Sequence, residues 1–247
     1  MPEVIVVVNA KGGTGKTTTS QSVAAALARL HDKKVLAIDA DSQGSLTLSC
    51  GISRGVSPTL HDVIVNGVDP LDVIVRDQLV PFDLIPGDRK LAFVDIERQG
   101  HRGNDRIVEG IVDRLQGYDY IVIDAARGFE MTSISAIIAA DGIIIPCEAQ
   151  YLSQAGLEDE LDTFKDVRNR SRARWIRVLF TRYSRSNHAQ SVIDNVRGTG
   201  IPTFDTIIRT NVDLAAAAGR GTDIFNYAPR SNGAADYAAL TREIVEL

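Results

Sequence analysis

The chain has 247 residues, of which 44% are hydrophobic and 24% are charged, and this ordinary globular composition excludes a fully disordered or fibrous protein. Its formal net charge of -5 excludes a uniformly basic nucleic-acid coat protein but not a local basic patch. The two cysteines, Cys50 and Cys147, form no Cys-x-x-Cys pair, which argues against a disulfide scaffold, a zinc ribbon or an iron–sulfur site within one chain.

Short apolar runs alternate with helical patterns along the chain. Residues 4–8 form a β-branched run typical of a strand buried on both faces, and a glycine-rich loop and a helix with Val23, Leu27 and Leu30 on one face follow. Further strands are predicted at residues 35–38, 82–85, 120–123, 142–145 and 178–180, with a weaker one at 203–208. Two more helices are marked by apolar residues at helical spacing: Leu157, Leu161, Phe164 and Val167 in one, and Tyr237, Leu240 and Ile244 in the other.

This alternation predicts an α/β fold, a mostly parallel twisted sheet with helices on both faces, as one domain over residues 1–247. Residues 51–106 are the least regular part. Ligands of such sheets bind outside the carboxyl ends of the strands, where we expect Asp39, Asp124 and the loop after the first strand. The N-terminus lacks a basic signal-peptide region and every apolar run is far shorter than the ~20 residues that span a bilayer, so we expect a cytoplasmic protein.

The strongest motif lies between the first strand and the first helix. Its glycines let the backbone curl, so that N–H groups and the helix N-terminus form a concave site for phosphate oxygens. The pattern predicts that Lys16 reaches the β- and γ-phosphates and that the Thr17 hydroxyl ligates Mg²⁺, although a glycine-rich turn without a ligand is the alternative. The residues of the motif are Gly12-Gly13-Thr14-Gly15-Lys16-Thr17-Thr18.

With Lys11 in front, the loop has the deviant form Lys-Gly-Gly-x-Gly-Lys-Thr-Thr, and the chain resembles the ParA/MinD family of ATPases. The resemblance implies a P-loop NTPase fold of the deviant Walker A (SIMIBI) type, with ATP and Mg²⁺ as cofactors. It also implies a homodimer closed face to face around two nucleotides, in which Lys11 of one subunit contacts the phosphates of the other. A second cation would stabilise the charge of the triphosphate, whereas a solvated loop lysine is the alternative reading of Lys11.

Carboxylates end two of the predicted strands. Asp39-Ala40-Asp41-Ser42-Gln43-Gly44 resembles the family's second motif, which implies that Asp39 supports the loop and the metal and that Asp41 orients the attacking water. Ser42 stands where the family usually has proline. Asp124 ends a Walker B pattern and can hold Mg²⁺ directly or through water. Helix capping or a turn is the alternative role for these acids.

The segment after Asp124 departs from the family pattern. The family commonly has Ala- or Thr-Pro-Pro-Ser there, whereas this chain has Ala125-Ala126-Arg127-Gly128. The switch thus loses two prolines and gains a cation, which leaves the hydrolysis rate and the activator's binding mode open. Arg127 could answer a phosphate, pair with a partner subunit, contact an activator or remain solvated.

The likeness continues over nearly the whole chain and is weakest across residues 51–106. Residues 145–157 resemble the family's dimer-face segment, and Thr181, Ile208 and Asn211 fall in the region that resembles its adenine pocket, with Arg209 in place of a proline. Because the first motif starts at residue 9, we expect the short ParA form without an N-terminal helix-turn-helix domain.

A basic stretch between residues 165 and 185 contains a single acid, Asp166. Such a stretch would give one concentrated positive surface for sequence-independent DNA contact, and a solvated helix end is the alternative. The DNA-contact candidates are Arg168, Arg170, Arg172, Arg174, Arg177 and Arg185, and Lys165 and Arg182 belong to the same stretch.

These features predict a partition or positioning ATPase of slow intrinsic activity. Its ATP-bound dimer would bind nucleoid DNA, and a ParB-like partner would stimulate hydrolysis and release it, so that a plasmid, chromosome origin or other cargo is moved. A MinD-like membrane role is disfavoured because acids flank the apolar positions of the last residues, 242–247, and no basic tail follows. An ATP-dependent ligase of the dethiobiotin synthetase type stays open, and an ATPase of the nitrogenase iron-protein type is disfavoured by the cysteines.

Overall fold

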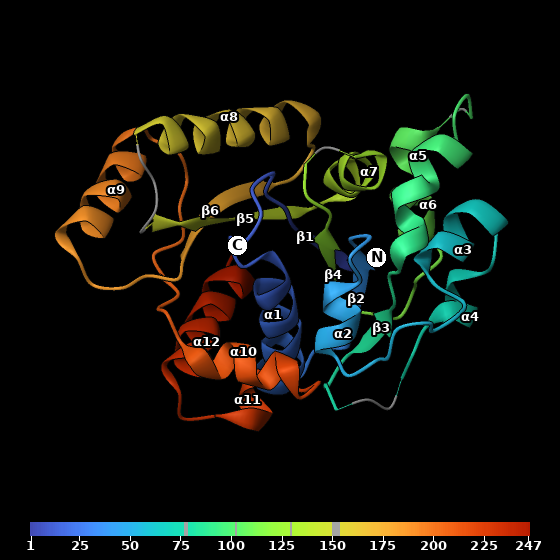
Figure 1. Cartoon of the computed structure of the whole chain (residues 1–247), viewed down its shortest axis with the longest axis horizontal. Helices are drawn as coiled ribbons and strands as arrows, with labels where there is room; N and C mark the ends of the chain where they lie inside the picture. The colour runs from blue at the N-terminus through green and yellow to red at the C-terminus, as the bar shows by residue number, and fades with distance from the viewer. Residues whose placement is uncertain (77–78, 102, 129, 150–153) are drawn as a thin grey trace.

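The computed structural model has a six-stranded parallel sheet in the order β3-β2-β4-β1-β5-β6 (Figure 1). It describes residues 1–247 apart from 77–78, 102, 129 and 150–153. The strands are β1 (Glu3–Val7), β2 (Val35–Ala40), β3 (Asp83–Ile85), β4 (Tyr120–Ala125), β5 (Gly142–Glu148) and β6 (Trp175–Thr181). The predicted parallel α/β sheet is thereby confirmed.

Helices cover both faces of this sheet (Figure 1). One face packs against α1 (Lys16–His31), α2 (Ser45–Ser49), α10 (Val212–Gly219), α11 (Ile224–Tyr227) and α12 (Asn232–Val245). The other face packs against α3 (Leu60–Asn66), α4 (Pro70–Val73), α5 (Val94–Glu97), α6 (Ile107–Val112), α7 (Met131–Ala139), α8 (Gln154–Arg170) and α9 (Asn187–Gly198). Two short 3₁₀ helices, η1 (Arg89–Phe93) and η2 (Asn104–Arg106), lie in the least regular part.

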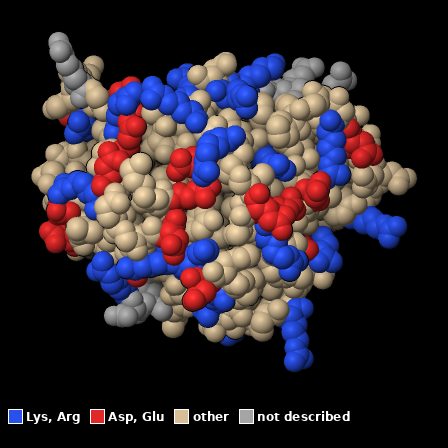
Figure 2. All heavy atoms as spheres, turned by 180° about the vertical axis from the view of Figure 1, so that it is seen from behind, with Lys and Arg blue, Asp and Glu red and all other residues tan. Residues whose placement is uncertain are grey.

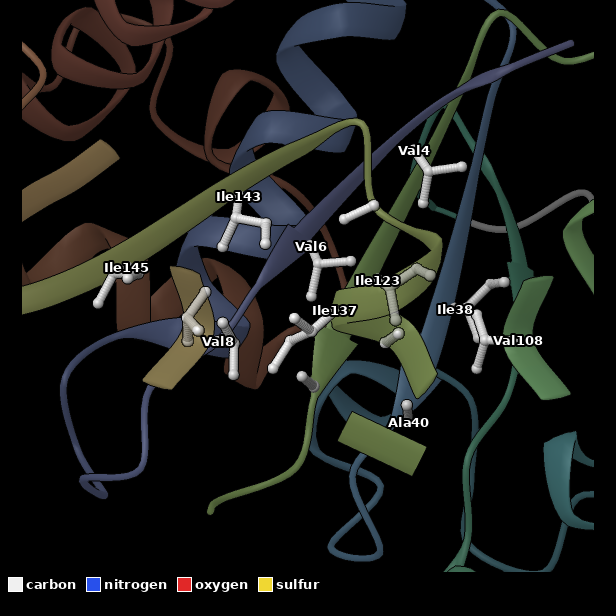
Figure 3. Packing of buried hydrophobic residues seen from close by; sticks show 14 of the residues in the cluster. Val4, Val6, Val8, Ile38, Ala40, Val108, Ile123, Ile137, Ile143 and Ile145 are labelled. Carbon is white, nitrogen blue, oxygen red and sulfur yellow. The ribbon is translucent and has the colours of Figure 1, made fainter. Parts of the chain in front are cut away.

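The two cores follow from the alternation of side chains along buried strands. On β1, Val4 and Val6 point to the face covered by α7, whereas Ile5 and Val7 point to the face covered by α1. Figure 3 shows the first set packed with Ile123 of β4 and other apolar side chains. Because both faces are covered, the central strands are apolar throughout, and polar side chains collect where the strands end.

The expectation of a strand at residues 203–208 was wrong. Residues 202–208 run beside β6, but the contact is made by separated hydrogen bonds, from Phe204 N to Val178 O at 3.0 Å and from Ile208 N to Phe180 O at 2.8 Å. Thr203 takes part in a single bridge to Val178. Between these two bonds, the backbone N–H groups of Asp205 and Thr206 donate to the Glu243 carboxylate at 2.9 and 2.8 Å, so the segment forms no continuous ladder with β6.

Two helix predictions differ in part from the structure. In α1, Val23 and Leu27 are buried as expected, but Leu30 is 50% exposed because it lies in the last turn. In α8, Phe164 and Val167 are buried, while the side chains of Leu157 and Leu161 lie outside the described residues. In the described part of the chain, no helix is both long and apolar enough to cross a bilayer.

Candidate nucleotide-binding site

The glycine-rich loop joins the end of β1 to the start of α1. Gly13 and Gly15 have φ angles of 83° and 91°, left-handed values that favour glycine. A Cβ placed on Gly13 would meet no atom within 4 Å, so the space beside this glycine is open. The loop leads directly into the N-terminus of a 16-residue helix, and a glycine-rich loop at a helix N-terminus is the arrangement that binds phosphate.

Three side chains hold this loop in shape. Asn9 donates from Nδ2 to the Pro146 carbonyl at 2.8 Å and accepts from the backbone N–H of Lys11 at 2.8 Å. The Thr181 hydroxyl donates to the Thr14 carbonyl at 2.7 Å. Lys16 reaches back over the loop, with Nζ 3.1 Å from the Asn9 carbonyl. The loop is therefore shaped by the protein itself, before any ligand contributes contacts.

A cavity of about 630 Å³ opens in front of the loop. That volume lies within the usual range for small-molecule sites. It brings together the phosphate-loop residues with the predicted Thr181, which ends β6, and with Ile208 and Asn211 from the segment between β6 and α10. The residues on its wall are Gly13, Gly15, Lys16, Thr17, Thr18, Asp41, Ser45, Arg127, Thr181, Arg182, Ile208, Arg209, Thr210, Asn211, Val212, Leu214, Ala215 and Tyr237.

Three of the predicted loop residues do not line this cavity. Lys11 has an exposed side chain and lies off the cavity wall. Gly12 lies behind Arg127, since a Cβ placed on Gly12 would be 3.2 Å from Arg127 Nη1. Thr14 is buried, and its hydroxyl has no hydrogen-bond partner among the described residues.

Two buried carboxylates lie side by side on neighbouring strands, behind the cavity wall. Asp39 and Asp124 are opposite one another in the β2–β4 register and are 0% and 1% exposed. Asp124 accepts from Thr17 Oγ1 at 2.8 Å and from Ser20 Oγ at 2.9 Å. Asp39 accepts from the backbone N–H and the hydroxyl of Thr47, both at 2.7 Å. Each acid is thus held in a fixed position by hydroxyl donors.

Burial disfavours the charged form of both acids. It raises the pKa of Asp39 to about 6, against the hydrogen bonds from Thr47. It raises the pKa of Asp124 to about 7, and the neighbouring charge of Asp39 adds to that effect. A cation close to this pair would favour the ionised forms of both groups.

These oxygen donors fit Mg²⁺ bound together with a nucleotide. Among the described residues, no group of three or more His, Cys, Asp or Glu side chains could hold a metal ion. Mg²⁺ does not need such a group, because it keeps several waters and binds through one or two protein oxygens and the substrate phosphates. Thr17 lies on the cavity wall with its hydroxyl oriented by Asp124, and Asp39 lies beside Asp124.

Asp41 lies on the same cavity wall, in the turn after β2. Its side chain accepts from the backbone N–H of Gln43 at 2.9 Å, and its own N–H donates to Asp39 at 3.3 Å. The residue is 8% exposed. A carboxylate on the wall of a phosphate cavity is in the right place to orient a water molecule.

Several site residues were missed by sequence reasoning. Ser20 lies one helical turn after Lys16, so its position beside Asp124 could have been inferred from the helix period. Thr47 contacts Asp39 only because α2 folds back over β2. Asp236 was also missed: it binds the guanidinium of Arg209 on the cavity wall, with contacts of 2.6 to 3.1 Å, and the 27-residue separation of the pair carries no local signal.

The structure contradicts the expectation of one concentrated positive surface. Arg174 precedes β6 and Arg185 follows it, so the seven residues of the strand, about 23 Å, separate them. Arg174 pairs with Glu3 at 3.0 Å, and the Arg177 guanidinium lies over the Phe204 ring, 5.8 Å from its centroid. Figure 2 shows basic and acidic side chains mixed over the back of the molecule.

The remaining candidates lie in two groups. Arg168 and Arg170 are exposed at the end of α8, and Arg172 is exposed in the segment that leads to β6. Arg172 and Arg174 line a cavity that also contains Glu3, Glu109, Asp113, Asp119 and Asp141. Arg185 is exposed beyond the carboxyl end of β6, close in sequence to Arg182 of the nucleotide cavity. The predicted dimer-face residues 150–153 lie outside the described residues.

Comparisons with known proteins agree with this geometry. A family model described as an AAA domain matches residues 2–176. The sporulation initiation inhibitor protein Soj of Bacillus subtilis is 33% identical over 250 residues, which cover 99% of this chain and 98% of that protein. The chromosome partitioning protein ParA of Caulobacter vibrioides is 32% identical over 253 residues, covering 98% of this chain and 93% of that protein. The solved structure of cobyrinic acid a,c-diamide synthase from Mycobacterium smegmatis, with bound ATP analog and magnesium, superposes with a TM-score of 0.87 at 25% identity, over 100% of this chain and 95% of that chain.

Proposed function

This chain belongs to the ParA/MinD family of ATPases, and we propose that it is a DNA-partition ATPase whose ATP-bound dimer binds DNA without sequence preference. It is an ATPase, which converts ATP and water to ADP and phosphate with ATP and Mg²⁺ as cofactors. The observation that carries the proposal is the pre-shaped deviant loop, which faces a cavity together with Thr17 and Asp41.

In this proposal the loop and Lys16 hold the β- and γ-phosphates, and Thr18 lines their site. Thr17 supplies the protein oxygen for Mg²⁺, with Asp124 orienting its hydroxyl and Asp39 fixed behind by Thr47. Mg²⁺ neutralises developing negative charge on the phosphates when it is bound. Asp41 orients the attacking water. Thr181, Ile208 and Asn211 line the end of the cavity that receives the nucleoside.

We assign Lys11 to contact with the nucleotide that a second subunit binds. Its backbone is fixed by Asn9 while its side chain is exposed and lies off the cavity of its own chain. A cation that projects from a phosphate loop is suited to the nucleotide of a facing copy, where it adds charge that neither subunit supplies alone. We therefore propose that ATP, with its extra phosphate, stabilises a homodimer that ADP does not.

DNA contact is assigned to two separate groups of arginines on each subunit. Arg168, Arg170 and Arg172 form one group, and Arg185 lies in the other, while Arg174 and Arg177 contribute less because Glu3 and Phe204 engage them. Guanidinium groups suit phosphate, and dimer formation doubles the number of contacts. ATP can control DNA affinity only if the dimer and the monomer differ in it.

A ParB-like partner that stimulates hydrolysis completes the cycle. Release of the dimer from DNA would then move a plasmid, a chromosome origin or another cargo along the nucleoid, within the cytoplasm. The solved diamide synthase keeps an ATP-dependent metabolic reaction as the second candidate, because its chain superposes over the whole length of this one. A metabolic enzyme would bind ATP without gaining affinity for DNA.

The test is binding to random-sequence duplex DNA with ATP, with ADP and without nucleotide, across a salt series. We expect tight binding with ATP alone, falling steeply with salt, and loss of binding in the Lys11→Ala variant. Arg168→Glu and Arg185→Glu, tested separately, assign the contact to one group or both. Equal DNA binding in all nucleotide states, or none in any, would reject the proposal in favour of another surface or a metabolic reaction.

A further inference from the structure

Four cationic side chains line the nucleotide cavity, and three of them already have partners. Lys16 contacts the Asn9 carbonyl. Arg182 donates to the Gly13 carbonyl at 3.3 Å and pairs with Glu148 at 3.5 Å, and Arg209 is bound by both carboxylate oxygens of Asp236. Within the described part of the chain, Arg127 takes part in no hydrogen bond or ion pair. Among the described arginines of this wall, Arg127 is therefore the one whose guanidinium donors are all left for a ligand, in addition to the Lys16 charge.

The position of Arg127 brings this charge over the phosphate loop. The residue follows the end of β4 by two positions, at the carboxyl edge of the sheet. Its side chain folds back against Gly12, where Nη1, Cδ and Cζ would lie 3.2, 3.5 and 3.7 Å from an added Cβ. Gly12 therefore leaves the room that the guanidinium occupies, and the side chain faces the same cavity as Lys16 and Thr17.

The order of the strands decides which end of the nucleotide Arg127 faces. Along the carboxyl edge, Asp41 follows β2, Arg127 follows β4, the phosphate loop follows β1 and Thr181 ends β6. The function proposed above places the nucleoside beside Thr181 and Asn211, which line the cavity on the β6 side. Phosphates that run from there across the loop end on the β4 and β2 side, where Arg127 and Asp41 lie.

We infer that Arg127 contacts the terminal phosphate of the ATP bound by its own subunit and stabilises the charge that spreads over this group during hydrolysis. The inference rests on the nucleotide site proposed above but not on DNA binding. In the reaction a water oxygen bonds to the γ-phosphorus while the bond from that phosphorus to the β,γ-bridging oxygen breaks. The electron pair leaves with ADP, and the proton of the water is released to solvent. A guanidinium fork is suited to the oxygens of the transferred group.

The test compares Arg127→Ala and Arg127→Lys with wild type, using a fluorescent non-hydrolysable ATP analogue and the matching ADP analogue with Mg²⁺. Protein is kept dilute, in a Lys11→Ala background, so that binding is measured on monomers. We expect Arg127→Ala to weaken the ATP analogue by about tenfold or more and the ADP analogue by less than about twofold, since a charge-assisted hydrogen bond to the terminal phosphate is lost. Arg127→Lys should restore part of the ATP affinity.

Controls separate this contact from a structural role and from a contact across subunits. Arg114 is paired with Asp69 and precedes β4, at the end of the strands away from the nucleotide cavity. Arg114→Ala should therefore leave both affinities unchanged. The melting temperature of nucleotide-free Arg127→Ala should match wild type. Equal losses for ATP and ADP analogues, no loss for either, or a loss that appears only when dimers form with Lys11 restored would each overturn the inference. Steady-state hydrolysis by Arg127→Ala should show a lower kcat, and an unchanged kcat would remove the catalytic part of the claim.

Discussion

Replacing Asp124 by asparagine should make the nucleotide-free protein more stable at alkaline pH. Asp124 is 1% exposed beside Asp39, and burial raises its pKa from 3.8 to about 7. A carboxyl whose pKa is higher in the folded state contributes most to stability below its unfolded pKa, and that contribution is lost as pH rises through about 7. At ~1.4 kcal/mol per pKa unit, the cost of ionisation grows by roughly 3 kcal/mol between mildly acidic and mildly alkaline solution.

Asparagine removes that charge but keeps only part of the local hydrogen bonding. Thr17 and Ser20 both donate to Asp124, and an amide offers one acceptor oxygen in place of two, which costs about 1 kcal/mol. The net gain for Asp124→Asn at mildly alkaline pH is therefore on the order of 1–3 kcal/mol, shrinking toward zero or below in mild acid. The same substitution should weaken Mg²⁺-dependent nucleotide binding.

Urea unfolding of both proteins without Mg²⁺, at a series of pH values, measures this difference directly. Asp113→Asn is the matched control, because Asp113 is exposed just beyond α6 and should give a difference that is small at every pH. A stability difference between Asp124→Asn and wild type that does not change with pH, or that grows toward acid, would refute the claim that burial makes ionisation of Asp124 costly.

Three further outcomes follow from the site. Lys16→Ala should abolish nucleotide binding, measured by calorimetry, and tight ATP binding by this variant would contradict the loop assignment. Asp41→Ala should still form dimers with ATP but hydrolyse it on the order of 100-fold more slowly or worse, measured by phosphate release, and turnover at the wild-type rate would exclude Asp41 as the water-orienting residue. Thr181→Val removes the donor to the Thr14 carbonyl and should weaken ATP by about fivefold, as loss of about 1 kcal/mol implies, whereas unchanged affinity would show that this bond does not shape the loop.

The sheet could be predicted because its strands are buried on both faces. Runs such as residues 4–8 and 120–123 are apolar without alternation, and this pattern marks parallel strands that helices cover. The segment at 203–208 mixes apolar residues with Asp205 and Thr206 and lies at the sheet edge beside β6, where the backbone N–H groups of these two residues donate to Glu243. Composition therefore identified the buried strands but also predicted a strand at the edge that the backbone does not form.

The site residues that form one contiguous motif could be predicted from the sequence, whereas contacts between distant segments could not. Gly13, Lys16 and Thr17 form one contiguous motif, so their grouping on one loop needs no tertiary contact to predict. The contact of Thr47 with Asp39 and that of Arg209 with Asp236 depend on how distant segments pack, and no spacing rule describes them.

The basic stretch shows the opposite limit of sequence reasoning. Arginines that are neighbours in sequence were expected to share one surface, but β6 places Arg174 and Arg185 beyond opposite ends of the strand. Proximity along an extended strand does not imply a common surface.

The central claim is that ATP, and not ADP, joins two copies of this chain through the exposed Lys11. Sedimentation velocity with a non-hydrolysable ATP analogue, with ADP and without nucleotide measures this directly on wild type and on Lys11→Ala. The account predicts dimers only for wild type with the ATP analogue and monomers in every other sample. A Lys11→Ala protein that dimerises as well as wild type, or a wild type that stays monomeric with saturating ATP analogue, would contradict it.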